Sequence, residues 1–207
     1  MIDQPKEVRK ENELDRKVLY EYLKVHIPNL MGDLTVQQYS GGASNITYLL
    51  TFGNLELILR CPPKGTISKG AHDMQREYNI MKALINFYPY VPKMIHFCDD
   101  SSIIGREFYI MEKITGIIPR ANLPKELHLD THQVKKLCLN TIDKLIELHR
   151  INIKDTPLSN FGKGEGYIQR QITGWTQRFS KAKTWNVPSC GKVIQWLQQN
   201  MPTKEMI

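Results

Sequence analysis

Residues 45–61 constrain the fold most, because their pattern is that of two strands joined by a tight turn. Apolar and polar side chains alternate in residues 45–52, and in 55–61 three leucines alternate with Glu56, Ile58 and Arg60, as expected for strands with two different faces. Gly53 and Asn54, between the two segments, are typical of a two-residue hairpin turn. The segment predicts an antiparallel hairpin with Arg60 on the face opposite to the leucines.

Further strands and helices are predicted on both sides of this hairpin. Strands are expected at residues 34–40, 93–98 and 107–113, and helices at 11–26, 69–86, 167–183 and 189–200. Residues 130–133 resemble a capping box that begins another helix ending near residue 149. Antiparallel strands followed by a run of helices predict an α+β fold with two lobes. We expect an N-terminal lobe over 1–114 and a hinge with a partial helical C-lobe over 115–207.

Composition excludes several classes of protein. In the 207 residues no apolar run approaches the ~20 residues that a membrane span needs, and the polar, charged residues 1–10 are not those of a secretory signal. The cysteines are far apart in the sequence and form no C-x-x-C motif: Cys61, Cys98, Cys138 and Cys190. We therefore expect buried, reduced thiols in a cytoplasmic protein, with no disulfide framework, zinc site or membrane partner.

Positive charge is concentrated in the last part of the chain. Residues 1–149 hold 19 basic and 18 acidic side chains, whereas residues 150–207 hold 9 and 3. Trp175, Trp185 and Trp196 lie among these basic residues, and such a mixture can stack on nucleic acid. Aromatic residues in amphipathic helices more often belong to a core, so we expect these three in the C-lobe core and do not expect nucleic acid as the partner.

Three positions together indicate phosphate chemistry. Gly41-Gly42-Ala43-Ser44-Asn45 lies between two predicted strands, Arg60 lies on a strand about eighteen residues later, and Glu77 lies on a helix about seventeen residues further on. Taken singly they fit an ordinary turn, a solvated strand residue and an exposed helix residue. Their order is that of a protein-kinase N-lobe, in which a glycine loop covers the phosphates and a strand cation contacts them while paired with a helix acid.

The same stretches carry a family resemblance. Residues 40–48, 57–63, 71–78, 91–93, 108–112 and 161–175 are similar to the aminoglycoside phosphotransferase superfamily of kinase-like enzymes. The chain most resembles the kinase-like domains that are fused to an acyl-CoA dehydrogenase in some proteins. This resemblance implies a five-stranded antiparallel N-lobe sheet with a helix, a helical C-lobe, and phosphorylation of a small-molecule hydroxyl by ATP with Mg²⁺.

The resemblance also implies roles for individual residues. The nucleotide-binding positions that it implies are Gly41, Gly42, Ser44, Asn45, Arg60, Glu77, Met111, Glu112 and Ile114. The first four correspond to the loop over the phosphates and the last three to the adenine-binding hinge. Arg60 stands where the family usually has a phosphate-binding lysine; it keeps the positive charge and adds a bidentate fork.

The catalytic motif of the family is missing. His128-Leu129-Asp130 has the spacing His-x-Asp, but no asparagine follows until Asn140, and we expect Asp130 to cap a helix. We therefore expect the catalytic and Mg²⁺-binding aspartates to lie beyond Ile207 in a longer kinase, and this chain alone to be inactive. The alternative is a complete, non-catalytic kinase-like module that binds a nucleotide or a protein. The hydroxyl acceptor is not specified by the sequence.

Overall fold

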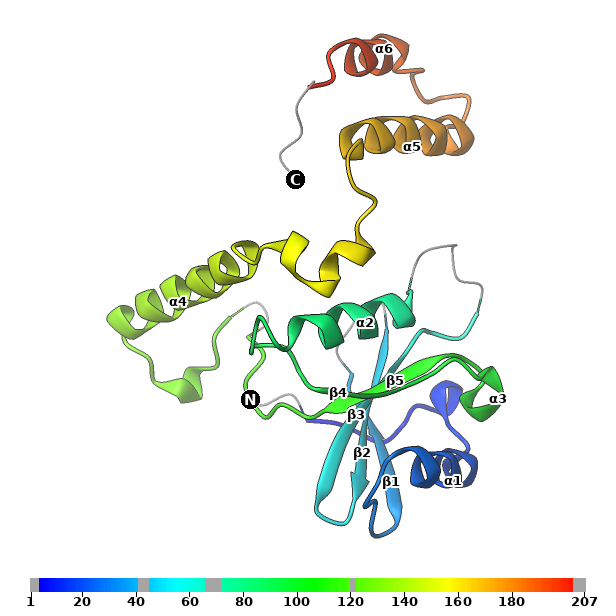
Figure 1. Ribbon diagram of the computed structural model, residues 1–207, viewed down its shortest axis with the longest axis vertical. Coiled ribbons are helices and arrows are strands. Elements are labelled where there is room, and N and C mark those ends of the chain that lie inside the picture. The colour runs from blue at the N-terminus through cyan, green and yellow to red at the C-terminus, as the bar shows by residue number, and fades with distance from the viewer. Residues whose placement is uncertain (1–3, 41–44, 66–71, 120–121, 203–207) are drawn as a thin grey trace. The chain divides into compact units, whose positions relative to one another are not determined.

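The computed structural model describes residues 4–40, 45–65, 72–119 and 122–202 (Figure 1). The strands are β1 (Leu34–Gln38), β2 (Ile46–Phe52), β3 (Leu55–Cys61), β4 (Met94–Cys98) and β5 (Phe108–Glu112). The α-helices are α1 (Arg16–His26), α2 (Met74–Leu84), α3 (Ser101–Ile104), α4 (Thr131–His149), α5 (Tyr167–Ala182) and α6 (Gly191–Gln199). Short 3-10 helices span Lys10–Asn12, Lys125–Leu127, Ile153–Asp155 and Pro157–Phe161.

The five strands form one antiparallel sheet in the order β1-β2-β3-β5-β4. The predicted hairpin is confirmed: β2 and β3 pair from Ile46 opposite Cys61 to Phe52 opposite Leu55, across the turn at Gly53 and Asn54. Strand β3 lies inside the sheet, between β2 and β5. The predicted fold class, α+β with a five-stranded antiparallel sheet, is therefore confirmed.

Helices cover both faces of the sheet, with α1 and α3 on one side and α2 on the other (Figure 1). On the first face, Leu19 and Leu23 of α1 join a buried core that includes Leu57 and Leu59 of β3. The second face carries a smaller cluster that is built around α2 and β5: Met74, Tyr78 and Tyr109. Full burial of one such apolar side chain stabilises a fold by about 1.5–3 kcal/mol. Strand β3 is packed on both faces, because it buries Leu57 and Leu59 on the first face and Ile58 on the second.

The chain before α1 differs from the prediction. A helix was expected from residue 11, but α1 begins at Arg16, because the Asp15 side chain accepts hydrogen bonds from the backbone N–H groups of Lys17 and Val18. Residues ahead of this cap run beside the sheet instead. An isolated bridge pairs Lys6 with Gln38, and the Tyr48 hydroxyl donates to the Asn12 carbonyl at 2.8 Å.

Other predicted elements are confirmed with shifted ends. Helix α2 begins at Met74 because Asp73 caps it, while predicted residues 69–71 lie outside the described residues. The expected polar turn at residues 99–102 contains the first part of the short helix α3, which Asp100 caps and Gly105 ends in the left-handed region at φ +83°. The predicted capping box at Asp130 is present and begins α4.

The four cysteines differ in burial. Cys61 and Cys98 are buried in the sheet as predicted, whereas Cys138 on α4 and Cys190 beside α6 are exposed, so the prediction of buried thiols was wrong for these two. All four are free. Burial raises the pKa of the Cys61 thiol to about 11, although the nearby Arg106 charge partly opposes this shift.

The chain divides into two compact units, Met1–Ser159 and Asn160–Ile207. In the second unit Trp175, Trp185 and Trp196 are 63%, 97% and 61% exposed, so the prediction of a core position for them was wrong. Trp175 lies on α5 and Trp196 on α6, whereas Trp185 lies between these two helices. The predicted lobe boundary between residues 114 and 115 stays a prediction. Across the described ranges, none of the helices combines the length and apolar character that crossing a membrane requires.

The Tyr48 hydroxyl provides a test of the N-terminal contact. We expect Tyr48→Phe to lower the free energy of unfolding by about 1–3 kcal/mol, because it leaves the Asn12 carbonyl without this donor in a buried setting. The matched control Tyr20→Phe removes an exposed hydroxyl that donates to the Gly32 carbonyl at 3.2 Å, and should cost less. Urea denaturation of both variants measures the difference. Equal losses in the two variants would contradict the burial argument.

Candidate functional site

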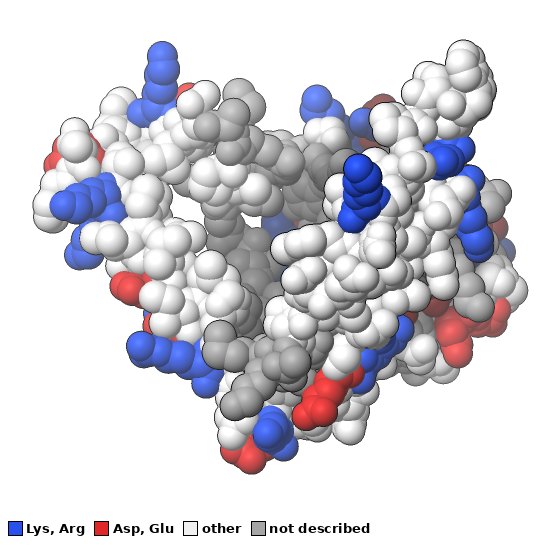
Figure 2. Space-filling model, turned by 90° about the horizontal axis from the view of Figure 1, so that it is seen from above, with Lys and Arg blue, Asp and Glu red and all other residues white. Residues whose placement is uncertain are grey.

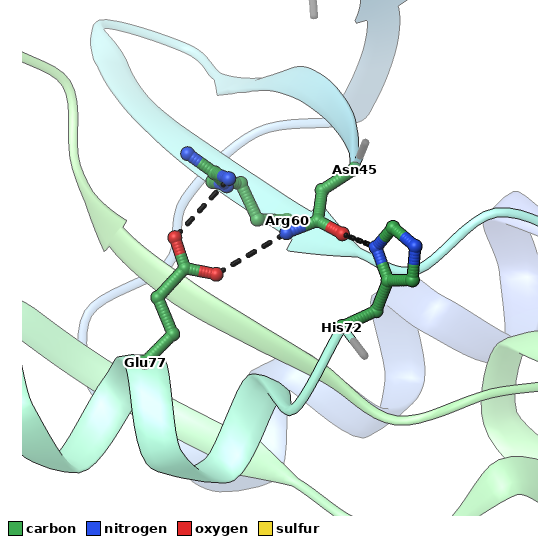
Figure 3. A network of polar contacts seen from close by, with 4 residues as sticks. All are labelled: Asn45, Arg60, His72 and Glu77. Atoms are coloured by element: carbon green, nitrogen blue, oxygen red, sulfur yellow. Dashed lines mark hydrogen bonds and ion pairs between the residues drawn. The ribbon is translucent and has the colours of Figure 1, made fainter. Parts of the chain in front are cut away.

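An ion pair between Arg60 and Glu77 joins the sheet to α2 (Figure 3). Arg60 is the penultimate residue of β3 and pairs in register with Thr47 on β2 and Tyr109 on β5. Glu77 lies in the first turn of α2. The Arg60 Nη2 atom is 3.1 Å from Glu77 Oε1, and the two side chains are 30% and 31% exposed. The predicted pairing of this strand cation with this helix acid is therefore present.

Two further side chains extend the ion pair into a network. Asn45, the residue before β2, donates from Nδ2 to the other Glu77 oxygen, Oε2, at 3.3 Å. His72 Nδ1 lies 2.6 Å from Asn45 Oδ1. Asn45 was among the predicted site residues, and His72 was not. Its position just before the cap of α2, five residues from Glu77, was the available signal.

Two buried donors lie next to the ion pair. Arg60 Nε is buried and makes no hydrogen bond in the described part of the chain, and the buried Tyr109 hydroxyl lies beside Glu77. Burial raises the pKa of Tyr109, and the nearby Arg60 charge offsets only part of this rise, so the hydroxyl keeps its proton. A buried donor without an acceptor costs about 1–3 kcal/mol.

The residues at this site fit a phosphate group. A guanidinium carries five N–H donors in a planar fork that matches phosphate oxygens, and the ion pair with Glu77 is made through Nη2. Glu77, in turn, holds the guanidinium from the helix side. The arrangement can therefore bind an anionic ligand while keeping its cation in a fixed orientation.

The predicted hinge residues lie at the far end of β5. Met111 packs against the cluster of α2 and β5, and Ile114, beyond the strand, is 62% exposed. Glu112 pairs in register with Leu57, three residues or about 10 Å along β3 from Arg60. Its backbone N–H donates to the Lys93 carbonyl at 3.0 Å, and its Oε1 accepts from the Lys93 N–H at 2.9 Å. Within the described ranges, no hydrogen bond or ion pair joins these residues to Arg60 or Glu77.

Other predicted positions are placed as follows. Gly41, Gly42 and Ser44 lie outside the described residues. Asp130 Oδ1 accepts from the Gln133 N–H at 2.8 Å, and its own N–H donates to Gln133 Oε1 at 2.9 Å, which confirms its predicted structural role. Within the ranges that the structure describes, no three His, Cys, Asp or Glu side chains are grouped as metal ligands.

Comparison with known proteins identifies the family. The family described as "Phosphotransferase enzyme family" matches residues 35–206. The chain belongs to this phosphotransferase family. Human acyl-CoA dehydrogenase family member 11 is 34% identical over 204 residues, which cover 96% of this chain and 26% of that protein. Mouse acyl-CoA dehydrogenase family member 10 is 35% identical over 199 residues, covering 96% and 18%.

A solved structure supports the same assignment. A putative aminoglycoside phosphotransferase from Ralstonia eutropha superposes with a TM-score of 0.70 at 27% identity, covering 93% of this chain and 55% of that one. The predicted resemblance and the kinase-like fold are thereby confirmed. This phosphotransferase-family chain spans about a quarter or less of the length of the two mammalian relatives.

The capping role of Asp130 in this phosphotransferase-family chain can be tested by substitution. We expect Asp130→Ala to lower the free energy of unfolding by about 1 kcal/mol, because the Gln133 N–H loses its acceptor. Asp130→Asn should be nearly neutral, since asparagine caps helices as well as aspartate does. Denaturant unfolding followed by circular dichroism measures both changes. An asparagine variant as unstable as the alanine variant would show that the charge of Asp130, and not its capping bond, matters.

Proposed function

We propose that this chain is the nucleotide-binding part of an ATP-dependent phosphotransferase that phosphorylates a hydroxyl group on a small molecule. Membership in the phosphotransferase family supports the reaction class. The observation that carries the proposal is the 3.1 Å ion pair between Arg60 and Glu77, which joins a sheet cation to a helix acid as nucleotide binding in a kinase-like lobe requires.

Each predicted residue has a role in this proposal. Arg60 neutralises phosphate charge, and Glu77 orients its guanidinium. Gly41, Gly42, Ser44 and Asn45 belong to the loop beside the phosphates. The backbone around Met111, Glu112 and Ile114 binds the adenine edge. ATP supplies the γ-phosphoryl group, and a small-molecule hydroxyl that remains to be identified accepts it.

Mg²⁺ enters the proposal together with ATP, where it would neutralise charge on the phosphates. The His-x-Asp sequence of this chain is already used in a structural role, because the Asp130 carboxylate caps α4. We therefore propose that the aspartates that bind Mg²⁺ and activate the hydroxyl belong to a part of the protein outside these 207 residues, and that the chain alone binds nucleotide without transferring phosphate. We place this activity in the cytoplasm.

The alternative proposal is a non-catalytic, kinase-like binding module. Asp130 caps a helix, and no other His-x-Asp occurs in the sequence. This observation supports the binding module as much as it supports a kinase whose catalytic aspartates lie elsewhere. The coding sequence beyond Ile207 separates the two proposals. A continuation with His-x-Asp and a second acidic motif supports the kinase, and a stop codon supports the module.

Substitution of Arg60 tests nucleotide binding. We expect Arg60→Ala to weaken MgATP binding by about 10- to 150-fold, because charge-assisted hydrogen bonds contribute about 1.5–3 kcal/mol each. Arg60→Lys keeps the charge and loses the fork, so its affinity should be intermediate. The control is Arg76→Ala, which removes the exposed arginine side chain that directly precedes Glu77 in the sequence. Isothermal titration calorimetry measures all four proteins, and equal affinity in wild type and Arg60→Ala would refute the proposal.

Transfer of phosphate is a separate test. We expect the 207-residue chain to release no phosphate from radiolabelled MgATP above the rate of a buffer blank, with or without hydroxyl-bearing small molecules. The reason is that its His-x-Asp aspartate serves as a cap. Turnover at an enzyme-like rate, on the order of 1 per second, would contradict the proposed inactivity while leaving the family assignment intact.

A further inference from the structure

Three contacts in series link four side chains at the edge of the site (Figure 3). Arg60 Nη2 contacts Glu77 Oε1, Glu77 Oε2 accepts from Asn45 Nδ2, and Asn45 Oδ1 contacts His72 Nδ1. The four residues come from β3, from α2 and from the residues just ahead of β2 and α2. Asn45 and His72 are not needed to form the ion pair itself, so their attachment to it calls for an explanation.

The direction of each hydrogen bond is set by Glu77. An ionised carboxylate only accepts, so the Asn45 side chain must turn its NH₂ group toward Glu77 and its carbonyl oxygen toward His72. A carbonyl oxygen also only accepts, so His72 must carry a hydrogen on Nδ1. The chain of donors therefore runs from His72 through Asn45 to Glu77, and a hydrogen on His72 Nδ1 reinforces the amide orientation that Glu77 sets.

The backbone of His72 supports a specific role for its side chain. His72 has φ +58°, in the left-handed region that costs a residue with a side chain roughly 1–2 kcal/mol. The following residue, Asp73, caps α2, with Oδ1 accepting from the Arg76 N–H at 2.8 Å. Left-handed conformations of such residues are retained where surrounding contacts determine them, and they cluster at functional sites. Here the 2.6 Å contact with Asn45 is such a contact.

The bond from Asn45 also controls how Glu77 meets Arg60. Carboxylates often pair with arginine through both oxygens and two N–H groups. In this structure Glu77 uses one oxygen for Arg60 and the other for Asn45, and Arg60 Nε is left buried without a partner in the described residues. Asn45 thus keeps the second carboxylate oxygen away from the guanidinium, so that the partly exposed Arg60 side chain keeps N–H groups that Glu77 does not engage.

We propose that His72 is a positioning residue of the nucleotide site. Through Asn45 it holds Glu77 in single-oxygen contact with Arg60, and this contact leaves the remaining N–H groups of Arg60 for the phosphates. The inference rests on the proposed function, because it assumes that Arg60 binds the phosphates of a nucleotide. It predicts that His72 affects the binding of phosphates and not the binding of the nucleoside.

Two variants of equal shape test the direction of this bond. His72→Asn places an amide NH₂ the same number of bonds from the backbone as Nδ1, whereas His72→Asp places an acceptor there. Both residues tolerate the left-handed region better than most others do. We expect His72→Asp to weaken MgATP binding by about tenfold and to change adenosine binding by less than about twofold, since tenfold corresponds to the loss of one hydrogen bond of about 1.4 kcal/mol. His72→Asn should bind MgATP within about threefold of wild type.

Isothermal titration calorimetry of the whole 207-residue chain with MgATP and with adenosine provides these affinities. Equal MgATP affinity in wild type and His72→Asp overturns the inference alone. Equal losses in His72→Asp and His72→Asn, or parallel losses for adenosine, also overturn it, because they indicate a merely structural role. Wild-type protein that binds no MgATP overturns the proposed function and this inference with it.

A measurement on the unaltered protein covers the case in which a variant does not fold. Long-range ¹H–¹⁵N correlation spectra distinguish a protonated from an unprotonated imidazole Nδ1. We expect His72 to carry its hydrogen on Nδ1 in the nucleotide-free protein. In Asn45→Ala, which removes the acceptor of this hydrogen bond, the imidazole should no longer prefer the tautomer protonated at Nδ1. An unprotonated His72 Nδ1 in the unaltered protein overturns the inference.

Discussion

The ion pair between β3 and α2 depends on the apolar packing of these two elements, and it adds little to the stability of the fold itself. Its side chains are about 30% exposed, and an ion pair in that setting contributes roughly 0–1 kcal/mol to folding. Its geometry is set instead by β3, which is held between two neighbouring strands and packed on both faces, and by α2, whose Met74 and Tyr78 are buried against the sheet. Stability and the proposed ligand binding therefore depend on different residues of the same two elements.

The sequence predicted the sheet well because a strand pattern is local. The alternation in residues 55–61 gave the bounds of β3, and it placed Arg60 opposite to Leu57 and Leu59, where α2 and Glu77 now lie. The alternation did not show that Ile58, which lies on the same side of β3 as Arg60, is buried as well. The short apolar run of Leu57, Ile58 and Leu59 fits a buried helix as well as a buried strand. Helix ends were shifted by caps such as Asp15 and Asp73, whose side-chain bonds a periodicity does not show.

The network around the ion pair was less predictable. Asn45 and His72 are 27 residues apart, and Asn45 and Glu77 are 32 apart, so no local pattern relates them. The exposed tryptophans were missed for a similar reason, because an amphipathic pattern shows that a helix has an apolar face and not what packs against it. Family membership does not remove this limit for the substrate, since one fold hosts many reactions.

The identity of residue 60 has a chemical consequence. A guanidinium stays protonated under all physiological conditions, whereas a lysine amine can lose its proton and act as a nucleophile. Amine-acylating reagents react with an unprotonated amine, and Arg60 offers no such amine. A survey of kinase-like proteins by that chemistry would leave Arg60 unmodified, whereas a dicarbonyl reagent selective for guanidinium groups could modify its partly exposed side chain.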